Sequence, residues 1–327
     1  MTERARTIFL ASGSFAVPIV LAVAEHPSLD LVAVVTAPTR RGSRGRPTDP
    51  PVADWAAANG LPMLRPTRLR DQESLAAIAD LRPDLLVLAD YGQIVPAALL
   101  ELPRHGALNL HPSLLPRHRG ASPIPAAILA GDLETGVSLM RMDAGLDTGP
   151  LIAQATRRLT GAEIAPELEA QLANAGAALL EGMLHDWVAG RLSASPQPME
   201  GVSVTRPLRR EDGRLDPIQP AAQLERQVRA YQPWPGSFVD TVEGRLLIWA
   251  SSVVPVFGAP PSFGLLTSGH DGVSGLGLLT ADGMLEFIEV QPAGGRRMTA
   301  AELLRGRPRL IGSTVQARPE ASPGSSA

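Results

Sequence analysis

The first 110 residues alternate short apolar runs with helical patterns, and this alternation constrains the fold more than any other feature of the sequence. Every position of the run 31–35 is apolar, as expected for a strand that is covered on both faces. Alternating strands and helices predict an α/β fold with an open, mostly parallel sheet, which binds ligands beyond the carboxyl ends of its strands. The candidate strands are 7–10, 31–35, 62–64, 85–88 and 107–110, and the candidate helices are 15–25, 52–59, 71–81 and 96–102.

The second half of the chain has a different pattern. A strand at 151–153 and a long helix at 165–189 are followed by a proline-containing segment with little periodicity, which we interpret as a linker. A short amphipathic helix is expected at 221–230. Short strand-like runs then predict a small antiparallel barrel or sandwich, at 236–242, 245–250, 264–267, 275–279 and 284–290.

Arginine supplies all 30 cationic side chains, and the chain contains neither lysine nor cysteine. These absences exclude a Walker-A phosphate loop, a Schiff-base enzyme, thiol nucleophiles, disulfides and cysteine zinc sites. With 33 acidic residues the net charge is −3, which argues against a uniformly basic nucleic-acid binder. Local basic patches are still compatible with this balance.

The N-terminus allows two interpretations. Arg4 and Arg6 precede an apolar stretch, and residues 22–24 resemble the cleavage site of a secretory signal peptide. However, Ser12-Gly13-Ser14 and Pro18 interrupt the apolar stretch, and the segment reads well as strand, turn and helix. No apolar run approaches the roughly 20 residues that span a membrane. We therefore expect a cytoplasmic protein without a membrane partner.

Three side chains suit acyl transfer. Asn109 and His111 lie two positions apart at the end of a predicted strand, so both point to the same face. An acidic, glycine-rich loop with Asp143 and Asp147 follows at 142–150. An amide can donate to a developing oxyanion, an imidazole can move protons, and a carboxylate can orient the imidazole or a water molecule. Taken singly, these motifs are also common turn sequences, and the two aspartates with one nearby histidine make a weak metal site.

Taken together, these segments resemble the formyltetrahydrofolate-dependent formyltransferases. The similarity is carried by 109–120, 131–137, 142–149, 221–226, 233–235 and 291–298, and it extends over roughly residues 7 to 310. It implies a Rossmann-like catalytic domain at 1–190, a linker at 191–213 and an OB-like β-barrel that binds tRNA at 214–312. Residues 313–327 are expected to form a disordered tail.

The resemblance also implies an activity. The protein would transfer the formyl group of 10-formyltetrahydrofolate to the amino group of methionyl-initiator tRNA, as a monomer and without a metal. Asn109, His111 and Asp147 match the catalytic residues of the family. The residues that match its folate-binding loop are Ser113, Leu114, Leu115 and Pro116.

Arginine patches are the candidate tRNA contacts. One patch lies in a loop that has no acidic residue from 37 to 48, and the resemblance matches this loop to the one that enters the acceptor arm. The alternative is a solvated loop. Phosphate contacts would supply affinity and salt dependence rather than sequence choice. The candidate residues are Arg40, Arg41, Arg44, Arg46, Arg209, Arg210, Arg296 and Arg297.

A departure in the first turn and two alternatives accompany this assignment. The first turn reads Ala-Ser-Gly-Ser-Phe at 11–15, where the family usually has Gly-Thr-Pro-Asp-Phe, so its folate contacts are expected to differ. A sugar-amine formyltransferase would use the same three catalytic residues, but the 291–298 segment and the arginine-rich loop argue against it. A non-catalytic tRNA-binding paralogue would not need those three residues intact.

Overall fold

The computed structural model describes residues 4–41, 47–256, 262–270 and 275–315. They divide into two compact units. Unit 1 contains residues up to 127, 133–160 and 167–207, and unit 2 contains 128–132, 161–166 and the chain from 208 onward. Residues 191–207, expected to belong to a linker, are therefore part of unit 1.

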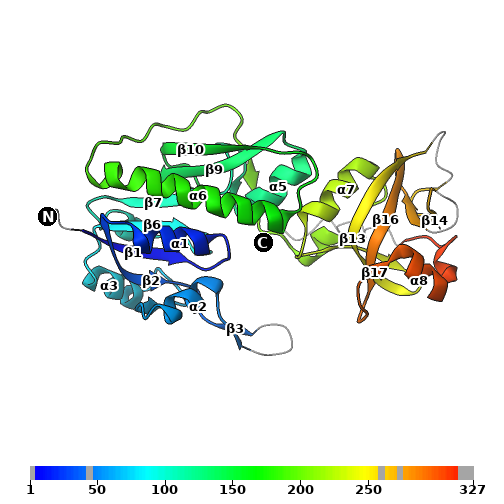
Figure 1. Cartoon of the computed structure of the whole chain (residues 1–327), viewed down its shortest axis with the longest axis horizontal. Helices are drawn as coiled ribbons and strands as arrows, with labels where there is room; N and C mark the ends of the chain where they lie inside the picture. The colour runs from blue at the N-terminus through cyan, green and yellow to red at the C-terminus, as the bar shows by residue number, and fades with distance from the viewer. Residues whose placement is uncertain (1–3, 42–46, 257–261, 271–274, 316–327) are drawn as a thin grey trace, which may run out of the picture. The chain divides into compact units, whose positions relative to one another are not determined.

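Unit 1 is built on a seven-stranded sheet with the order β10-β9-β7-β6-β1-β2-β5 (Figure 1). The five strands from β7 to β5 in this order run parallel, and β9 runs antiparallel to both of its neighbours, β7 and β10. The expected open, mostly parallel sheet is confirmed. The strands are β1 (Ala5–Ala11), β2 (Leu29–Val35), β5 (Met63–Leu64), β6 (Leu85–Ala89), β7 (Ala107–His111), β9 (Glu134–Arg141) and β10 (Leu151–Arg158).

Helices cover both faces of this sheet. On one face, Gly176 of α6 approaches Leu110 of β7 and Ile19 of α1, so α1 and α6 pack side by side. On the other face, Ile78 of α3 and Leu99 of α4 join a buried cluster with alternate residues of β1 and β6. The helices are α1 (Ala16–Glu25), α2 (Pro51–Ala58), α3 (Gln72–Asp80), α4 (Ala97–Leu100), α5 (Pro123–Ala130) and α6 (Ala165–Val188).

Two short ribbons complete unit 1. β3 (Arg40–Arg41) pairs with β4 (Pro47–Thr48) in antiparallel register. β8 (Arg119–Gly120) pairs with β11 (Val204–Thr205) in parallel register. Neither ribbon is predicted from the sequence, because two-residue strands carry no measurable periodicity.

Unit 2 is an antiparallel sheet with the order β12-β13-β16-β15-β14, and β17 pairs with β16. Its outer strands β12 and β14 do not pair with each other in the described part of the chain, so the predicted barrel is an open half-barrel. Leu224 of α7 and Leu303 of α8 pack into its core. The elements are α7 (Ala221–Ala230), β12 (Ser237–Thr241), β13 (Gly244–Pro255), β14 (Leu266–Ser268), β15 (Leu276–Leu279), β16 (Gly283–Pro292), β17 (Met298–Thr299) and α8 (Ala300–Gly306), with short 3-10 turns η2 (Arg210–Gly213) and η3 (Pro308–Leu310).

The first residues of the expected tail are ordered. Thr314 forms a β-bridge with Leu265, and Val315 is 7% exposed and donates its N–H to the carbonyl of Gly264. The expectation of disorder is therefore wrong for 313–315, and residues 316–327 lie outside the described residues.

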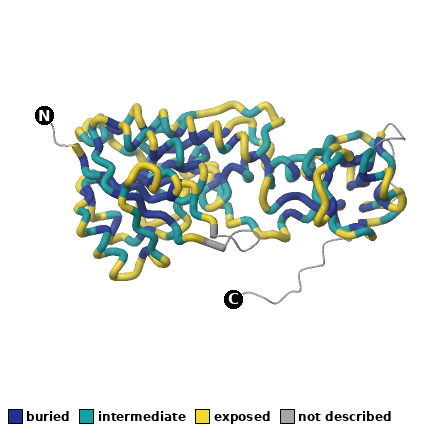
Figure 2. The backbone as a smooth tube through the Cα atoms, turned by 60° about the horizontal axis from the view of Figure 1, so that its bottom comes forward, coloured by how far each residue is buried: buried dark blue, intermediate teal, exposed yellow. Residues whose placement is uncertain are grey.

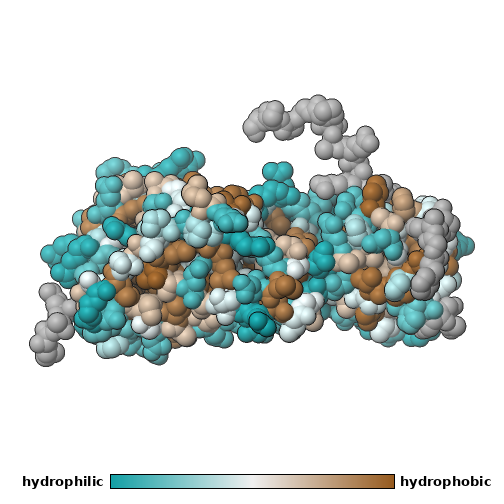
Figure 3. Space-filling view, turned by 90° about the horizontal axis from the view of Figure 1, so that it is seen from above, coloured by the Kyte–Doolittle hydropathy of each residue, from teal (hydrophilic) through white to brown (hydrophobic). Residues whose placement is uncertain are grey.

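In both units, buried segments of the backbone lie in the interior and exposed segments lie outside them (Figure 2). On the face shown in Figure 3, apolar side chains are interspersed with hydrophilic ones. Among the described residues, no helix combines the length and apolar character needed to cross a lipid bilayer.

Candidate active site

The carboxyl end of β7 carries two of the predicted catalytic residues. Asn109 pairs with Leu88 of β6 on one side and with Met140 of β9 on the other. His111 is the last residue of β7 and is only 5% exposed, whereas Asn109 is half-buried. Because side chains alternate along a strand, the amide and the imidazole share one face of the sheet. The Asn109 amide has no hydrogen-bond partner in the described part of the chain, so it is available to a ligand.

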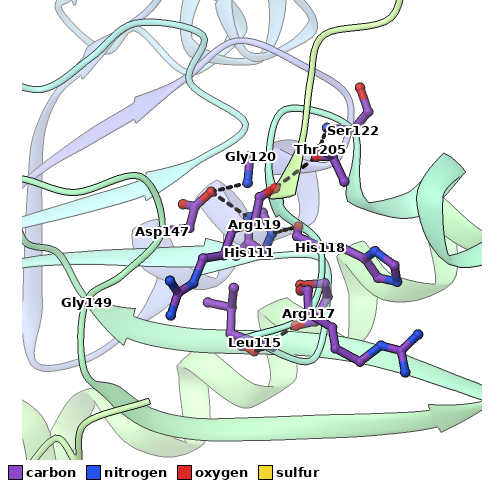
Figure 4. A network of polar contacts seen from close by, with 12 residues as sticks. His111, Leu115, Arg117, His118, Arg119, Gly120, Ser122, Asp147, Gly149 and Thr205 are labelled. Carbon is purple, nitrogen blue, oxygen red and sulfur yellow. Dashed lines mark hydrogen bonds and ion pairs between the residues drawn. The ribbon is translucent and has the colours of Figure 1, made fainter. Parts of the chain in front are cut away.

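His111 and Asp147 lie next to each other (Figure 4). Nε2 of His111 is 2.9 Å from the carbonyl oxygen of His118, so the neutral ring donates there and its lone pair is on Nδ1. Nδ1 faces Oδ2 of Asp147 at 3.6 Å, which is too long for a good hydrogen bond. A proton on Nδ1 would turn this contact into a charge-assisted ion pair. The structure thus brings together two of the three predicted catalytic residues, and the third lies on the same strand.

The surroundings of His111 favour its neutral form. Burial lowers the pKa of His111, and the carboxylate of Asp147 and the hydrogen bond to the His118 carbonyl oppose this effect. A histidine whose pKa lies below its usual value is neutral at pH 7 and can accept a proton. Asp147 would then stabilise the imidazolium that forms.

Polar side chains of β9 and β10 form hydrogen bonds with the backbone of the loop at 113–116, which follows His111. Ser138 of β9 donates from Oγ to the carbonyl of Ser113 at 2.7 Å and accepts from the N–H of Leu115 at 3.0 Å. Gln154 of β10 donates to the carbonyl of Leu115 at 3.0 Å. Of the predicted folate-binding residues, Ser113, Leu115 and Pro116 are buried and Leu114 is half-buried. Ser138 was not predicted from the sequence, although a serine within the otherwise apolar run 137–140 was a detectable signal.

Asp90 lies at the carboxyl end of β6, beside the altered first turn, and was also missed. A Cβ on Gly13 would come within 1.6 Å of Oδ2 of Asp90, so a side chain at this position would displace the Asp90 carboxylate. Asp90 is exposed to solvent as a residue, but its carboxylate lies against the backbone of Gly13 and is partly desolvated there. This desolvation, together with the charge of Glu169, raises the pKa of Asp90 to about 6. A glycine in the turn and an aspartate ending an apolar strand were the available signals.

The predicted tRNA-binding arginines lie in both units. Arg40 and Arg41 form β3, and Arg44 and Arg46 lie outside the described residues. Arg209 and Arg210 are exposed at the start of η2 in unit 2.

The second arginine pair of unit 2 contacts acids and an aromatic ring. Arg296 is 3.7 Å from Glu302, and Arg297 is 3.8 Å from Glu289. The guanidinium of Arg297 also lies 3.4 Å from the ring centroid of Trp249, a cation–π contact. The two arginine side chains remain 75% and 49% exposed.

A recess of unit 1 lies away from these residues. It has a volume of about 220 Å³ and is lined by residues of α4 and by 141–144. Met142 donates its N–H to the carbonyl of Ala107, which places the recess at the amino end of β7, opposite to His111. It is therefore not the site formed by the predicted catalytic residues.

Comparisons with known proteins agree with the sequence resemblance. The family model described as formyl transferase matches residues 5–184, and the model described as formyl transferase, C-terminal domain, matches residues 207–308. The methionyl-tRNA formyltransferase of Myxococcus xanthus is 42% identical over 313 residues, which cover 95% of this chain and 98% of the relative. The enzyme of the same name from Thermus thermophilus is 42% identical over 304 residues, covering 92% and 96% of the two chains.

Solved structures show the same fold. An N-formyltransferase from Helicobacter canadensis, solved in complex with folinic acid and dTDP-3-aminofucose, has a TM-score of 0.64 at 17% identity and covers 90% of this chain and 100% of its own. Because this identity is low, the likeness concerns the fold alone. The family model, however, covers more than half of the chain, and the relatives match nearly its full length. The chain therefore belongs to the formyl transferase family.

Proposed function

We propose that this protein transfers the formyl group of 10-formyltetrahydrofolate to the free amino group of methionyl-initiator tRNA. The observation that carries the proposal is the His111–Asp147 pair at the carboxyl end of β7, two residues from Asn109. Relatives named methionyl-tRNA formyltransferase match both units of the chain at 42% identity. The second unit is thus shared with proteins named for a tRNA substrate.

The site supplies what formyl transfer requires. The amine attacks the formyl carbon, and the Asn109 amide donates a hydrogen bond to the oxygen that becomes negatively charged. His111 accepts the proton of the attacking amine on Nδ1, and Asp147 stabilises the resulting imidazolium. The same proton then passes to the folate nitrogen as the bond between this nitrogen and the formyl carbon breaks. The products are an N-formyl amine and tetrahydrofolate, so atoms and charges balance.

The loop at 113–116 is proposed to contact the folate. Since most of its side chains are buried, we expect it to act through backbone groups and Leu114, with Ser138 and Gln154 fixing its conformation. The hydrogen bonds from Ser138 and Gln154 to the backbone of this loop support this role.

The arginines are proposed to bind the tRNA backbone. Arg40 and Arg41 belong to unit 1, and Arg209, Arg210, Arg296 and Arg297 belong to unit 2. Arg44 and Arg46, which share the proposed role, lie outside the described residues. A guanidinium that stacks on Trp249, as that of Arg297 does, still presents its edge N–H groups to phosphate oxygens. We also propose that the protein acts as a monomer in the cytoplasm, which sedimentation with and without tRNA would test.

Formyl transfer by the purified protein tests the proposed function. Charged initiator tRNA and a nucleotide-linked aminosugar are offered separately with 10-formyltetrahydrofolate, and the formylated product is measured. We expect product only from the tRNA. Product from the aminosugar alone would contradict the proposal.

A further inference from the structure

We propose that Gln197 is a positioning residue that holds Asp147 in place beside His111. It lies in the segment 195–205, which the sequence reading assigned to a linker. The role deepens the proposed function and rests on it, because it concerns the geometry of the same site. Two sets of contacts and one backbone conformation support it.

The first is a closed ring of hydrogen bonds. The side-chain amide of Gln197 donates to the carbonyl oxygens of Asp147 and Gly149, both at 2.8 Å. Its Oε1 accepts from Nε and Nη2 of Arg119 at 3.1 and 2.6 Å. The residue after Arg119 is Gly120, whose N–H donates to Oδ2 of Asp147 at 2.8 Å (Figure 4). Gln197 therefore closes a ring that fixes both the backbone and the carboxylate of Asp147.

The second set of contacts connects the segment 195–205 with residues 118–120. Ser203 accepts the N–H of His118 on its Oγ at 2.8 Å, and its carbonyl accepts the N–H of Arg119 at 2.9 Å. β11 then pairs with β8 so closely that a Cβ on Gly120 would lie 2.3 Å from the carbonyl oxygen of Thr205. Residues 118–120 contact both His111 and Asp147. The segment 195–205 thus fixes the part of the chain that connects the two catalytic residues.

The third is the backbone conformation of Asp147 itself. Its φ is +52°, in the left-handed region that non-glycine residues seldom adopt. Such a conformation persists only where neighbouring contacts hold it. The Gln197 amide binds the Asp147 carbonyl directly, so it opposes relaxation of this backbone.

Loss of the Gln197 amide has a defined consequence for His111. Asp147 and His118 are the titratable groups that act on His111, and the charge of Asp147 raises the pKa of His111 against the effect of burial. If Asp147 moves away, its contribution falls and the pKa of His111 decreases further. A general loss of stability would not by itself lower the pKa of His111 in the folded protein.

The test uses Gln197→Met, which keeps the length of the side chain and removes its polar groups. We expect kcat to fall by about 10- to 100-fold, because small displacements of catalytic groups have effects of this size. The pKa of His111, followed by NMR in the free protein, should move to lower pH. In an Asp147→Asn background the same substitution should change kcat by less than about 2-fold, because Gln197 acts through Asp147.

Gln227→Met is a matched control. The Gln227 amide also donates to two carbonyls two residues apart, those of Asp212 and Arg214 at 3.2 Å each, but in unit 2. Its loss should lower the thermal unfolding midpoint without moving the pKa of His111. Gln197→Leu is the second variant, for use if Gln197→Met fails to fold. It removes the donors to Asp147 without adding a charge, so the same pKa change is expected.

Two results would overturn this role. One is an unchanged pKa of His111 in the folded Gln197 variant, and the other is an equal loss of kcat with and without the Asp147 carboxylate. Failure of the proposed function can be told apart from failure of the Gln197 role, since the wild-type protein would then not formylate methionyl-tRNA. The NMR titration would still report the positioning role in that case.

Discussion

Oδ2 of Asp147 lies 3.6 Å from Nδ1 of His111 and 2.8 Å from the backbone nitrogen of Gly120. The hydrogen bond to Gly120 keeps the carboxylate at a distance where it can stabilise a protonated ring without fixing a proton on Nδ1 of the neutral ring. His111 therefore retains a basic nitrogen that faces a negative charge. This relationship is the basis of the first two predictions.

Removing the proposed catalytic side chains should abolish most of the activity. His111→Ala is expected to lower kcat for formyl transfer by about 10²- to 10⁴-fold, the usual contribution of a positioned acid or base. Asn109→Ala should cost about 10²- to 10³-fold, because one oxyanion donor is lost. Single-turnover assays measure both effects. Unchanged transfer by the Asn109→Ala, His111→Ala double variant would refute the assigned site.

The pH dependence of kcat/KM should report the titration of His111. Since the ring must be neutral to accept a proton, activity rises with pH through its pKa, and burial places this pKa below the ordinary value of 6.5. Asp147→Asn removes the opposing charge, so the rising limb should move to still lower pH while kcat falls. The substrate amine must also be neutral and adds its own rising limb at about pH 7 to 8. The contradicting result is therefore a pKa of His111 above 6.5 in an NMR titration of the free wild-type protein.

The carboxyl group of Asp90 should have a pKa well above that of an ordinary aspartate. We expect an NMR titration of its carboxyl to give a pKa of about 6, and Glu169→Gln should lower this value by removing a nearby negative charge. The folded carboxyl binds its proton more tightly than the unfolded one, so its contribution to stability is present at low pH and is lost as the pH rises through 6. Asp90→Asn should therefore gain stability relative to wild type over that rise. A pKa near 3.8 would contradict this view of the first turn.

Arg296 and Arg297 should contribute to the salt dependence of tRNA binding. If both contact phosphates, replacing them by alanine lowers the slope of log affinity against log salt by up to about 2. Arg191→Ala is a suitable control, since Arg191 is an exposed arginine of unit 1 paired with Asp186. An unchanged slope in the double variant would exclude these residues as phosphate contacts.

The parallel part of the fold could be predicted because its strands are short apolar runs between amphipathic helices. β9 was not predicted as a strand, although it lies beside β7, and only the first three residues of β10 were expected. β10 is the outermost strand, and its second half, up to Arg158, is polar and mostly exposed. Such an edge strand carries no alternating apolar signal, so a sequence reading ends it early.

The proposed catalytic residues could be identified from the sequence because Asn109 and His111 lie at the end of a strand within a family motif. Gln197 and Ser203 could not, since they act by hydrogen bonds from side chains to distant backbone groups. Such bonds leave no periodicity in the sequence. The proline residues around Gln197 even favoured a linker. Only the folded chain brings this segment against the Asp147 loop.

The most direct test of the proposed function compares charged initiator and elongator methionyl-tRNA as formyl acceptors. Purified wild-type protein and the Asn109→Ala, His111→Ala double variant are assayed with 10-formyltetrahydrofolate, and N-formylmethionyl-tRNA is quantified. We predict efficient transfer to the initiator by wild-type protein, little transfer to the elongator, and almost none by the double variant. Absence of transfer to charged initiator tRNA by the folded wild-type protein would contradict the function.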